Sequence, residues 1–292
     1  MSYKFAILST VGTSVLSNVE KNADKLKGSR ARDLFSNKSK LPSRLPVDDE
    51  LQDLFRSMSR PGNEVFDDVF NLVKSDPLTY SAELNTITTY LNKYPAKAHI
   101  SEVLIILYPT DTGTSIFSSW IIKHYIEAEP MDFRRRADLP NSTLIRVDEP
   151  VVLRGFGKGV EWFKAGLMDL MDKFTGRIIE LKGKGYRVVV NPTGGFKPES
   201  AYLTLIAMLA GAWRIIYSHE SFREVVELPA LPITIDPKYR ESLSQVTQGV
   251  SRGVLEELGV DVNDLVDKGL IEVGEEGVHV KEWVIKLLEL IK

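Results

Sequence analysis

The chain has 292 residues, of which 43% are hydrophobic and 26% charged, and its formal net charge is −3. This composition predicts a globular protein with one large and one small domain, and the mildly acidic balance disfavours a protein coated in nucleic acid. The absence of cysteine excludes disulfides, thiolate zinc sites and a cysteine nucleophile. No apolar run reaches the ~18–20 residues of a membrane span, and the N-terminus leads directly into a strand rather than a signal peptide, so we expect a cytoplasmic protein with no membrane partner.

The first expected strand, Lys4–Leu8, is followed by a hydroxyl-rich turn, Ser-Thr-Val-Gly-Thr-Ser at 9–14, and by a helix from about Val15. Gly12 allows the tight turn. The hydroxyls in this turn could contact a ligand or simply cap the helix, and both interpretations stay open. They belong to Thr10, Thr13 and Ser14.

A basic segment comes next. Residues 21–44 hold eight Lys or Arg residues against two acidic ones, a local balance of +6 in a chain that is acidic overall. Such a run is commonly a solvated face, but beside an anion-binding turn it could also steer a polyanion inward.

Helical periodicity predicts three helices, over Asp48–Met58, Glu64–Lys74 and Thr79–Tyr94, before the next strand, Val103–Tyr108. These helices form an insertion between the first two strands.

Another hydroxyl-rich turn, Pro-Thr-Asp-Thr-Gly-Thr-Ser at 109–115, follows that strand and precedes an apolar helix through Trp120. Thr110, Asp111 and Thr112 could contact a ribose or an adenine edge. Asp111 and Thr112 fit helix capping at least as well.

Thr143–Val147 is expected to be a further strand, Val151–Gly155 is another short apolar run, and a long helix is expected from about Lys158 to Lys182. Arg154 ends the second segment, where its guanidinium could reach a phosphate.

The stretch 186–200 combines a buried strand, a glycine turn and the start of an apolar helix from about Pro198. The run Val188–Val190 is typical of a strand in a parallel α/β sheet, and open sheets of this kind bind ligands at the carboxyl ends of their strands. Gly194 and Gly195 permit a close approach of a ligand to the backbone, and the helix N-terminus favours an anion. The alternative is a tight turn with no ligand. The polar side chains available here are Asn191, Thr193 and Lys197.

Two more strands are expected over Trp213–Tyr217 and Val225–Leu228. Strands that alternate with helices imply βαβ crossovers. The predicted fold class is therefore α/β, with a Rossmann-like, mostly parallel sheet flanked by helices over residues 1–235.

Residues 236–292 show short helices, a hairpin with a Gly-Glu-Glu-Gly turn and a final amphipathic helix, a pattern that predicts a small winged helix-turn-helix domain. Residues 237–292 hold seven basic and eleven acidic residues, a balance of −4, and Glu275 and Glu276 are at the expected wing tip. Because phosphate contact needs the opposite sign, we expect dimerisation or another interaction rather than DNA binding.

The residues also limit the chemistry. No His, Asp or Glu cluster has metal-ligand spacing, and no Gly-x-Ser-x-Gly elbow occurs. The turns could cleave RNA through its own 2′-hydroxyl, with Lys197 and the Gly194 and Gly195 amides stabilising the phosphorane and Thr13 or Ser14 positioning the substrate. The turns contain no strong general base, which predicts a slow enzyme. Arg214 and His219 match the R-x4-H pattern of HEPN ribonucleases, but they lie in an expected core strand.

Taken together, the turns at Ser9–Asn18 and Asn191–Lys197 resemble the CARF domains of CRISPR-associated proteins over about residues 3–235. The resemblance implies a homodimer whose two sets of turns form one two-fold site for cyclic oligoadenylate, most often cyclic tetra-adenylate.

The short tail with a winged-helix pattern is similar to that of the stand-alone CRISPR ring nucleases, which cleave cyclic tetra-adenylate without a metal or cofactor and switch off antiviral signalling. By this resemblance the catalytic lysine is Lys197, and the catalytic hydroxyl is one of Thr10, Thr13 and Ser14. The alternatives are a CARF transcription regulator that reads the same ligand and a scaffold with a vestigial pocket.

Overall fold

The computed structural model describes residues 2–156, 160–195, 197–219, 224–246, 250–274 and 277–290. Its main feature is a six-stranded sheet in the order β3-β2-β1-β4-β5-β6. The strands are β1 (Tyr3–Val11), β2 (Ile100–Pro109), β3 (Leu144–Val147), β4 (Tyr186–Asn191), β5 (Arg214–His219) and β6 (Glu224–Leu228). The first five run parallel and β6 pairs antiparallel with β5. The mostly parallel α/β fold is therefore confirmed.

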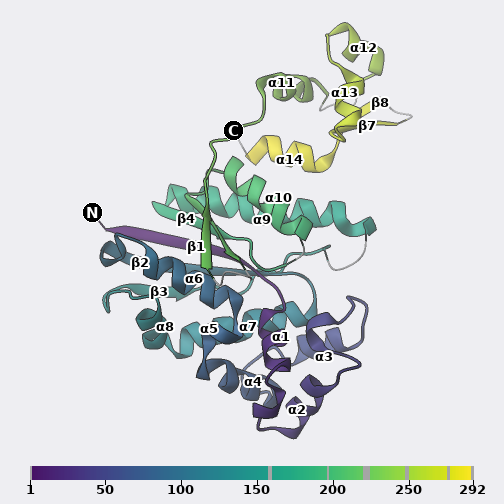
Figure 1. Ribbon diagram of the computed structural model, residues 1–292. Coiled ribbons are helices and arrows are strands. Elements are labelled where there is room, and N and C mark those ends of the chain that lie inside the picture. The colour runs from purple at the N-terminus through teal and green to yellow at the C-terminus, as the bar shows by residue number, and fades with distance from the viewer. Residues whose placement is uncertain are drawn as a thin grey trace.

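Helices cover both faces of the sheet (Figure 1). Along β1, Phe5 and Ile7 face one buried core while Ala6 and Leu8 face the other, because side chains alternate along a strand. The first core is covered by α1 (Ser14–Glu20), α2 (Ser29–Ser36), α3 (Leu51–Ser57), α4 (Glu64–Ser75), α5 (Pro77–Tyr80), α6 (Ala82–Lys93), α7 (Gly113–Ala128) and α8 (Pro130–Arg136). The second core is covered by α9 (Phe163–Gly183) and α10 (Lys197–Leu209).

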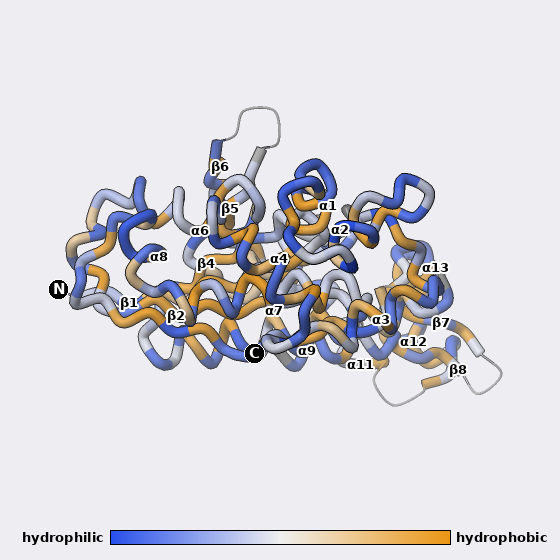
Figure 2. The backbone as a smooth tube through the Cα atoms, turned by 90° about the horizontal axis from the view of Figure 1, so that it is seen from below, coloured by the Kyte–Doolittle hydropathy of each residue, from blue (hydrophilic) through white to orange (hydrophobic). Residues whose placement is uncertain are grey.

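Short 3-10 turns join several of these elements. They are η1 (Ala23–Lys25), η2 (Pro42–Arg44), η3 (Lys97–His99) and η4 (Val160–Trp162). The basic segment is thus folded into η1, α2 and η2, and Figure 2 shows the chain around α1 and α2 largely hydrophilic while the central strands are hydrophobic. Within the described residues, no helix has both the length and the apolarity needed to cross a membrane.

One local prediction was wrong. The single helix expected over Thr79–Tyr94 is divided at Ser81, whose extended backbone ends α5 and whose hydroxyl accepts a hydrogen bond from the Leu84 amide at 3.2 Å to cap α6. The short apolar run Val151–Gly155 forms one bridge to the sheet, between Leu153 and Thr110. The segment is apolar because Leu153 packs into the second core, not because it extends the sheet.

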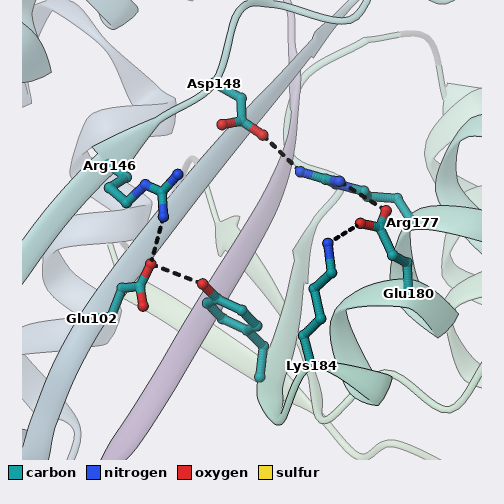
Figure 3. Close-up of polar contacts among 7 residues, drawn as sticks. Glu102, Arg146, Asp148, Arg177, Glu180 and Lys184 are labelled. Carbon is teal, nitrogen blue, oxygen red and sulfur yellow. Dashed lines mark hydrogen bonds and ion pairs between the residues drawn. The ribbon is translucent and has the colours of Figure 1, made fainter.

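Two groups of polar contacts lie on the α9 side of the sheet (Figure 3). Glu102 accepts hydrogen bonds from Tyr186 at 2.8 Å and Arg146 at 3.4 Å, near the start of β2 and β4. Arg177 of α9 bonds to Asp148 at 2.7 Å. The Arg177–Asp148 contact therefore ties α9 to the residue after β3, while the bonds of Glu102 join β2, β3 and β4.

The C-terminal residues form a smaller unit with its own buried core. Its elements are α11 (Pro237–Val246), α12 (Arg252–Glu257), α13 (Val262–Asp267), β7 (Ile271–Gly274), β8 (Gly277–Val280) and α14 (Glu282–Leu290). The strands β7 and β8 form an antiparallel hairpin, as expected, although Glu275 and Glu276 at its tip lie outside the described residues. Helix α14 returns to α9 and α10 (Figure 1), where the Trp283 ring lies 6.4 Å from that of Tyr202.

Candidate functional site

The site lies where the direction of strand addition reverses. The chain leaves β1 towards β2 on one side and leaves β4 towards β5 on the other, so the turns after β1 and β4 open beside each other. Ser9 pairs with Asn191 at the ends of these two strands. Such a switch point is the usual ligand site of an open α/β sheet.

The two turns touch through their backbones. A Cβ atom on Gly194 would lie 2.5 Å from the Gly12 nitrogen and 2.9 Å from the Thr10 carbonyl oxygen, so only glycine fits there. Gly195 has a φ of +94°, which also favours glycine, and is exposed. The predicted glycine turn is therefore needed so that the turn after β4 can pack against the turn after β1.

Three of the predicted ligand-binding side chains hold these turns together. The Thr10 hydroxyl donates to the Gly194 carbonyl at 2.6 Å, and the Asn191 amide donates to the Ser9 hydroxyl at 2.9 Å. The Thr193 hydroxyl donates to the Asn191 side-chain oxygen at 2.5 Å. Thr10 and Asn191 are fully buried, so their polar groups are directed into the protein. They shape the site, and contact with a ligand stays a prediction for them.

The first turn is also bonded to a residue that the sequence analysis missed. Glu83, near the start of α6, is only 1% exposed, yet it accepts hydrogen bonds from the Ser14 hydroxyl at 2.6 Å and the Gly12 amide at 3.1 Å. In sequence Glu83 is an ordinary first-turn carboxylate after the N-cap Ser81. Nothing local indicates its contact with residues about seventy positions earlier.

Two cavities flank the contact between the turns. One, of about 270 Å³, is lined by Gly12, Thr13, Ser14, Ser17, Ala82, Glu83, Thr193, Gly194, Gly195 and Ser218. The other, of about 300 Å³, is lined by Gly12, Thr13, Ser43, Arg44, Leu45, Val47, Gln52, Thr110, Thr112, Thr114, Ser115 and Gly195. The structure therefore gathers eight of the predicted site residues, from the turns after β1, β2 and β4.

The hydroxyls after β2 have structural partners as well. Thr112 caps α7 by accepting from the Ser115 amide at 3.3 Å, and its hydroxyl lies 3.2 Å from that of Thr110. The capping interpretation is thus correct for Thr112, whose side chain still borders the second cavity.

Asp111 and Arg154 lie apart from both cavity linings. The Asp111 carboxylate accepts from the Gly155 amide at 3.1 Å, which ties the turn after β2 to the following segment. Arg154 is exposed, and its backbone amide donates to Asp169 at 2.8 Å.

Lys197 is the first residue of α10, directly beyond the glycine turn, but its side chain lies outside the described residues. A helix N-terminus suits an anion, and here the Glu199 carboxylate of the first turn of α10 already lies beside the glycine turn, where a Cβ atom on Gly195 would be 2.5 Å from a Glu199 oxygen.

A third cavity, of about 560 Å³, adjoins the second through Ser43 and Arg44 and is also bordered by Lys21 and Lys38. Glu20 and Asp24 border it as well, so part of the basic segment reaches the site in a mixed-charge setting, and steering of a polyanion stays a prediction. In contrast, Arg214 lies on strand β5, where it pairs with Glu227 at 3.3 Å, so the R-x4-H match is not on a helix; the His219 side chain lies outside the described residues.

Among solved structures, the chain is similar to Can2 from Sulfobacillus thermosulfidooxidans in complex with cyclic tetra-adenylate, with 14% sequence identity and a TM-score of 0.29. The match covers 72% of this chain and 61% of that chain, so this chain spans less than two thirds of the length of Can2. The family described as CRISPR-associated protein (Cas_APE2256) matches residues 78–231, more than half of the sequence. The chain belongs to this CRISPR-associated family.

Proposed function

We propose that this protein is a ring nuclease that binds cyclic tetra-adenylate across a homodimer and cleaves it, without a metal, to linear di-adenylate with a 2′,3′-cyclic phosphate. Its role would be to end CRISPR antiviral signalling in the cytoplasm. The observation that carries the proposal is the meeting of the Gly12 and Gly194–Gly195 turns at the switch point of the sheet, between two cavities. Membership of a CRISPR-associated family supports it.

The reaction needs little from the protein beyond positioning and charge stabilisation. The ribose 2′-oxygen attacks the adjacent phosphorus, and the bond from phosphorus to the 5′-oxygen breaks. In this proposal, amides of the exposed turn at Gly195 stabilise the phosphorane oxygens, and Lys197, the first residue of α10, adds a positive charge. Ser14 and Thr13, on the opposite wall of the same cavity, position the ribose.

The direct test is incubation of the pure protein with radiolabelled cyclic tetra-adenylate in EDTA, beside Lys197→Ala. The matched control is Lys93→Ala, an exposed lysine at the far end of α6. We expect the wild type and Lys93→Ala to produce di-adenylate with a cyclic phosphate end and Lys197→Ala to lose that activity. Tight binding with the ring left intact would refute the enzyme and leave a sensor.

The second candidate is a transcription regulator that senses cyclic oligoadenylate. One observation favours it: α10 runs from the glycine turn to the C-terminal unit, where Tyr202 meets Trp283. A helix in that position can transmit a change at the turn. The balance of −4 over residues 237–292 disfavours DNA contact. A mobility shift of DNA that depends on cyclic tetra-adenylate would support the regulator.

A further inference from the structure

We propose that Glu83 is a positioning residue that acts through Ser14, taking up the proton that the ribose 2′-hydroxyl loses during cleavage. This inference rests on the proposed function. It supplies the base that the turns themselves lack.

The geometry around Glu83 is that of a built site. The side chain is 1% exposed and accepts three hydrogen bonds, from the Gly12 amide at 3.1 Å, the Ser14 hydroxyl at 2.6 Å and the Ser81 hydroxyl at 3.0 Å. A carboxylate is costly to bury unless such donors satisfy it. Among the described lining residues of the 270 Å³ cavity, Glu83 is the one titratable side chain.

Helix capping does not account for this arrangement. The N-cap of α6 is already provided by Ser81, whose hydroxyl accepts from the Leu84 amide. Besides the bond from the Ser81 hydroxyl, the Glu83 carboxylate bonds to the first turn, 69 and 71 residues away in sequence. It therefore serves the turn after β1.

The hydrogen bonds of Ser14 define a path for a proton. A serine hydroxyl has one hydrogen to donate and two lone pairs that accept. Ser14 donates to Glu83 at 2.6 Å and accepts from the Ala82 amide at 3.2 Å, which leaves one lone pair for a ligand in the cavity. A ribose hydroxyl placed there would donate to Ser14.

In the proposed step, the 2′-hydroxyl hydrogen moves to the Ser14 oxygen as the Ser14 hydrogen moves to Glu83. The 2′-oxygen forms its bond to phosphorus, and the leaving 5′-oxygen takes a proton from water. Ser14 is regenerated, and Glu83 afterwards returns its proton to solvent, so atoms and charge balance.

The proposed step also requires the phosphate to be bound away from the Glu83 charge. Gly12 separates the two ends of the cavity, because its amide bonds to Glu83 while a Cβ atom on Gly12 would lie 3.2 Å from the Gly195 nitrogen. The ribose would face Ser14 and Glu83, and its phosphate would face Gly195 and α10.

The test separates binding from cleavage. Binding is measured with a tetra-adenylate ring whose 2′-hydroxyls are methylated, and cleavage is measured in single turnover with the natural ring in H₂O and in D₂O. Glu83→Gln keeps the size of the side chain but cannot accept the Ser14 proton. Glu64→Gln, another first-turn carboxylate on an exposed part of α4, is the control.

We expect Glu83→Gln to bind the methylated ring within about threefold of wild type but to cleave the natural ring on the order of 10²–10⁴-fold more slowly, with a reduced solvent isotope effect. Glu83→Asp, which keeps a carboxylate, should recover part of the rate and of the isotope effect. Glu64→Gln should match wild type in all three measurements.

Two results overturn the inference. The first is wild-type cleavage by Glu83→Gln. The second is a parallel loss of binding and cleavage with an unchanged isotope effect, which describes a purely structural residue. Should Glu83→Gln fail to fold, wild-type cleavage by a folded Ser14→Ala, which lacks the hydroxyl that passes the proton to Glu83, has the same meaning. A wild-type protein that binds the ring without cleaving it would refute the proposed function itself. That outcome differs from a failure of the Glu83 inference alone, in which the wild type still cleaves the ring.

Discussion

Gly194 packs so closely on Gly12 that a Cβ atom added to Gly194 would lie 2.5 Å from the Gly12 nitrogen. The atoms in the way are backbone atoms of β1 and its turn, which cannot rotate aside as a side chain can. The relative position of the two turns, and with it the shape of both cavities, therefore depends on the absence of a side chain at Gly194.

Gly194→Ala should destabilise the protein by about 1–3 kcal/mol and widen the site, because the two turns must separate. Gly176→Ala is the matched control: this glycine lies inside α9, and a Cβ atom there would meet nothing within 4 Å. Alanine should raise the stability of α9 by about 0.5–1 kcal/mol. Urea unfolding of both variants measures the difference, and equal effects from the two would contradict the close packing of the turns.

Arg44 should contribute to the affinity for cyclic tetra-adenylate, since it borders both the 300 Å³ cavity and the adjoining 560 Å³ cavity. We expect Arg44→Ala to weaken binding of cyclic tetra-adenylate by roughly 3–10-fold and to reduce the slope of log affinity against log salt by about 0.7. Lys25→Ala removes a charge from the same basic segment without touching either lining and should leave binding unchanged. Titrations at several salt concentrations provide the measurement, and identical slopes for wild type and Arg44→Ala would exclude a phosphate contact.

Asp132 should make the free energy of unfolding depend on pH in the acidic range. Burial acts to raise its pKa, but hydrogen bonds from Arg136, Tyr125 and Arg135 outweigh burial and lower the pKa to about 2, from a usual 3.8. Because the unfolded state binds the proton more tightly, the stabilisation is complete above about pH 4 and is lost as pH falls towards 2.

Asp132→Asn should therefore be less stable than wild type by up to about 2 kcal/mol at pH 7, and the two should converge near pH 2. Asp53→Asn, at an exposed position of α3, is expected to follow wild type at every pH. Denaturant unfolding between pH 7 and pH 2 tests this, and a gap that stays constant over the range would show that the ion pairs contribute nothing specific.

Trp283 should hold the C-terminal unit on the sheet domain, since its side chain packs against both the second core and the C-terminal core. Burial raises the pKa of its neighbour Tyr202 to about 12, consistent with a dry contact. Trp283→Ala should cost about 2–3 kcal/mol and divide one unfolding transition into two. Leu258→Ala, at a 59% exposed position in the same unit, should keep a single transition. A single transition in both variants would mean that the contact is not what couples the two parts.

Local sequence was sufficient to predict the strand, the turn and the helix that form the site. The β-branched run at Val188–Val190 and the glycine turn after it have strong local preferences, so the strand, the turn and the start of α10 near Lys197 follow from those residues alone. The alternation of strands and helices was sufficient for the parallel sheet, because βαβ crossovers admit few topologies.

Only the tertiary structure decided what each polar group does. Thr10 and Asn191 are turn residues in sequence, yet the pairing of β1 with β4 buries them completely. Glu83 gives no sign in sequence of its place beside Ser14, because the intervening helices bring the two together. Hydrogen bonds over such separations depend on how helices pack on the sheet, and packing is not encoded in any one segment of the chain.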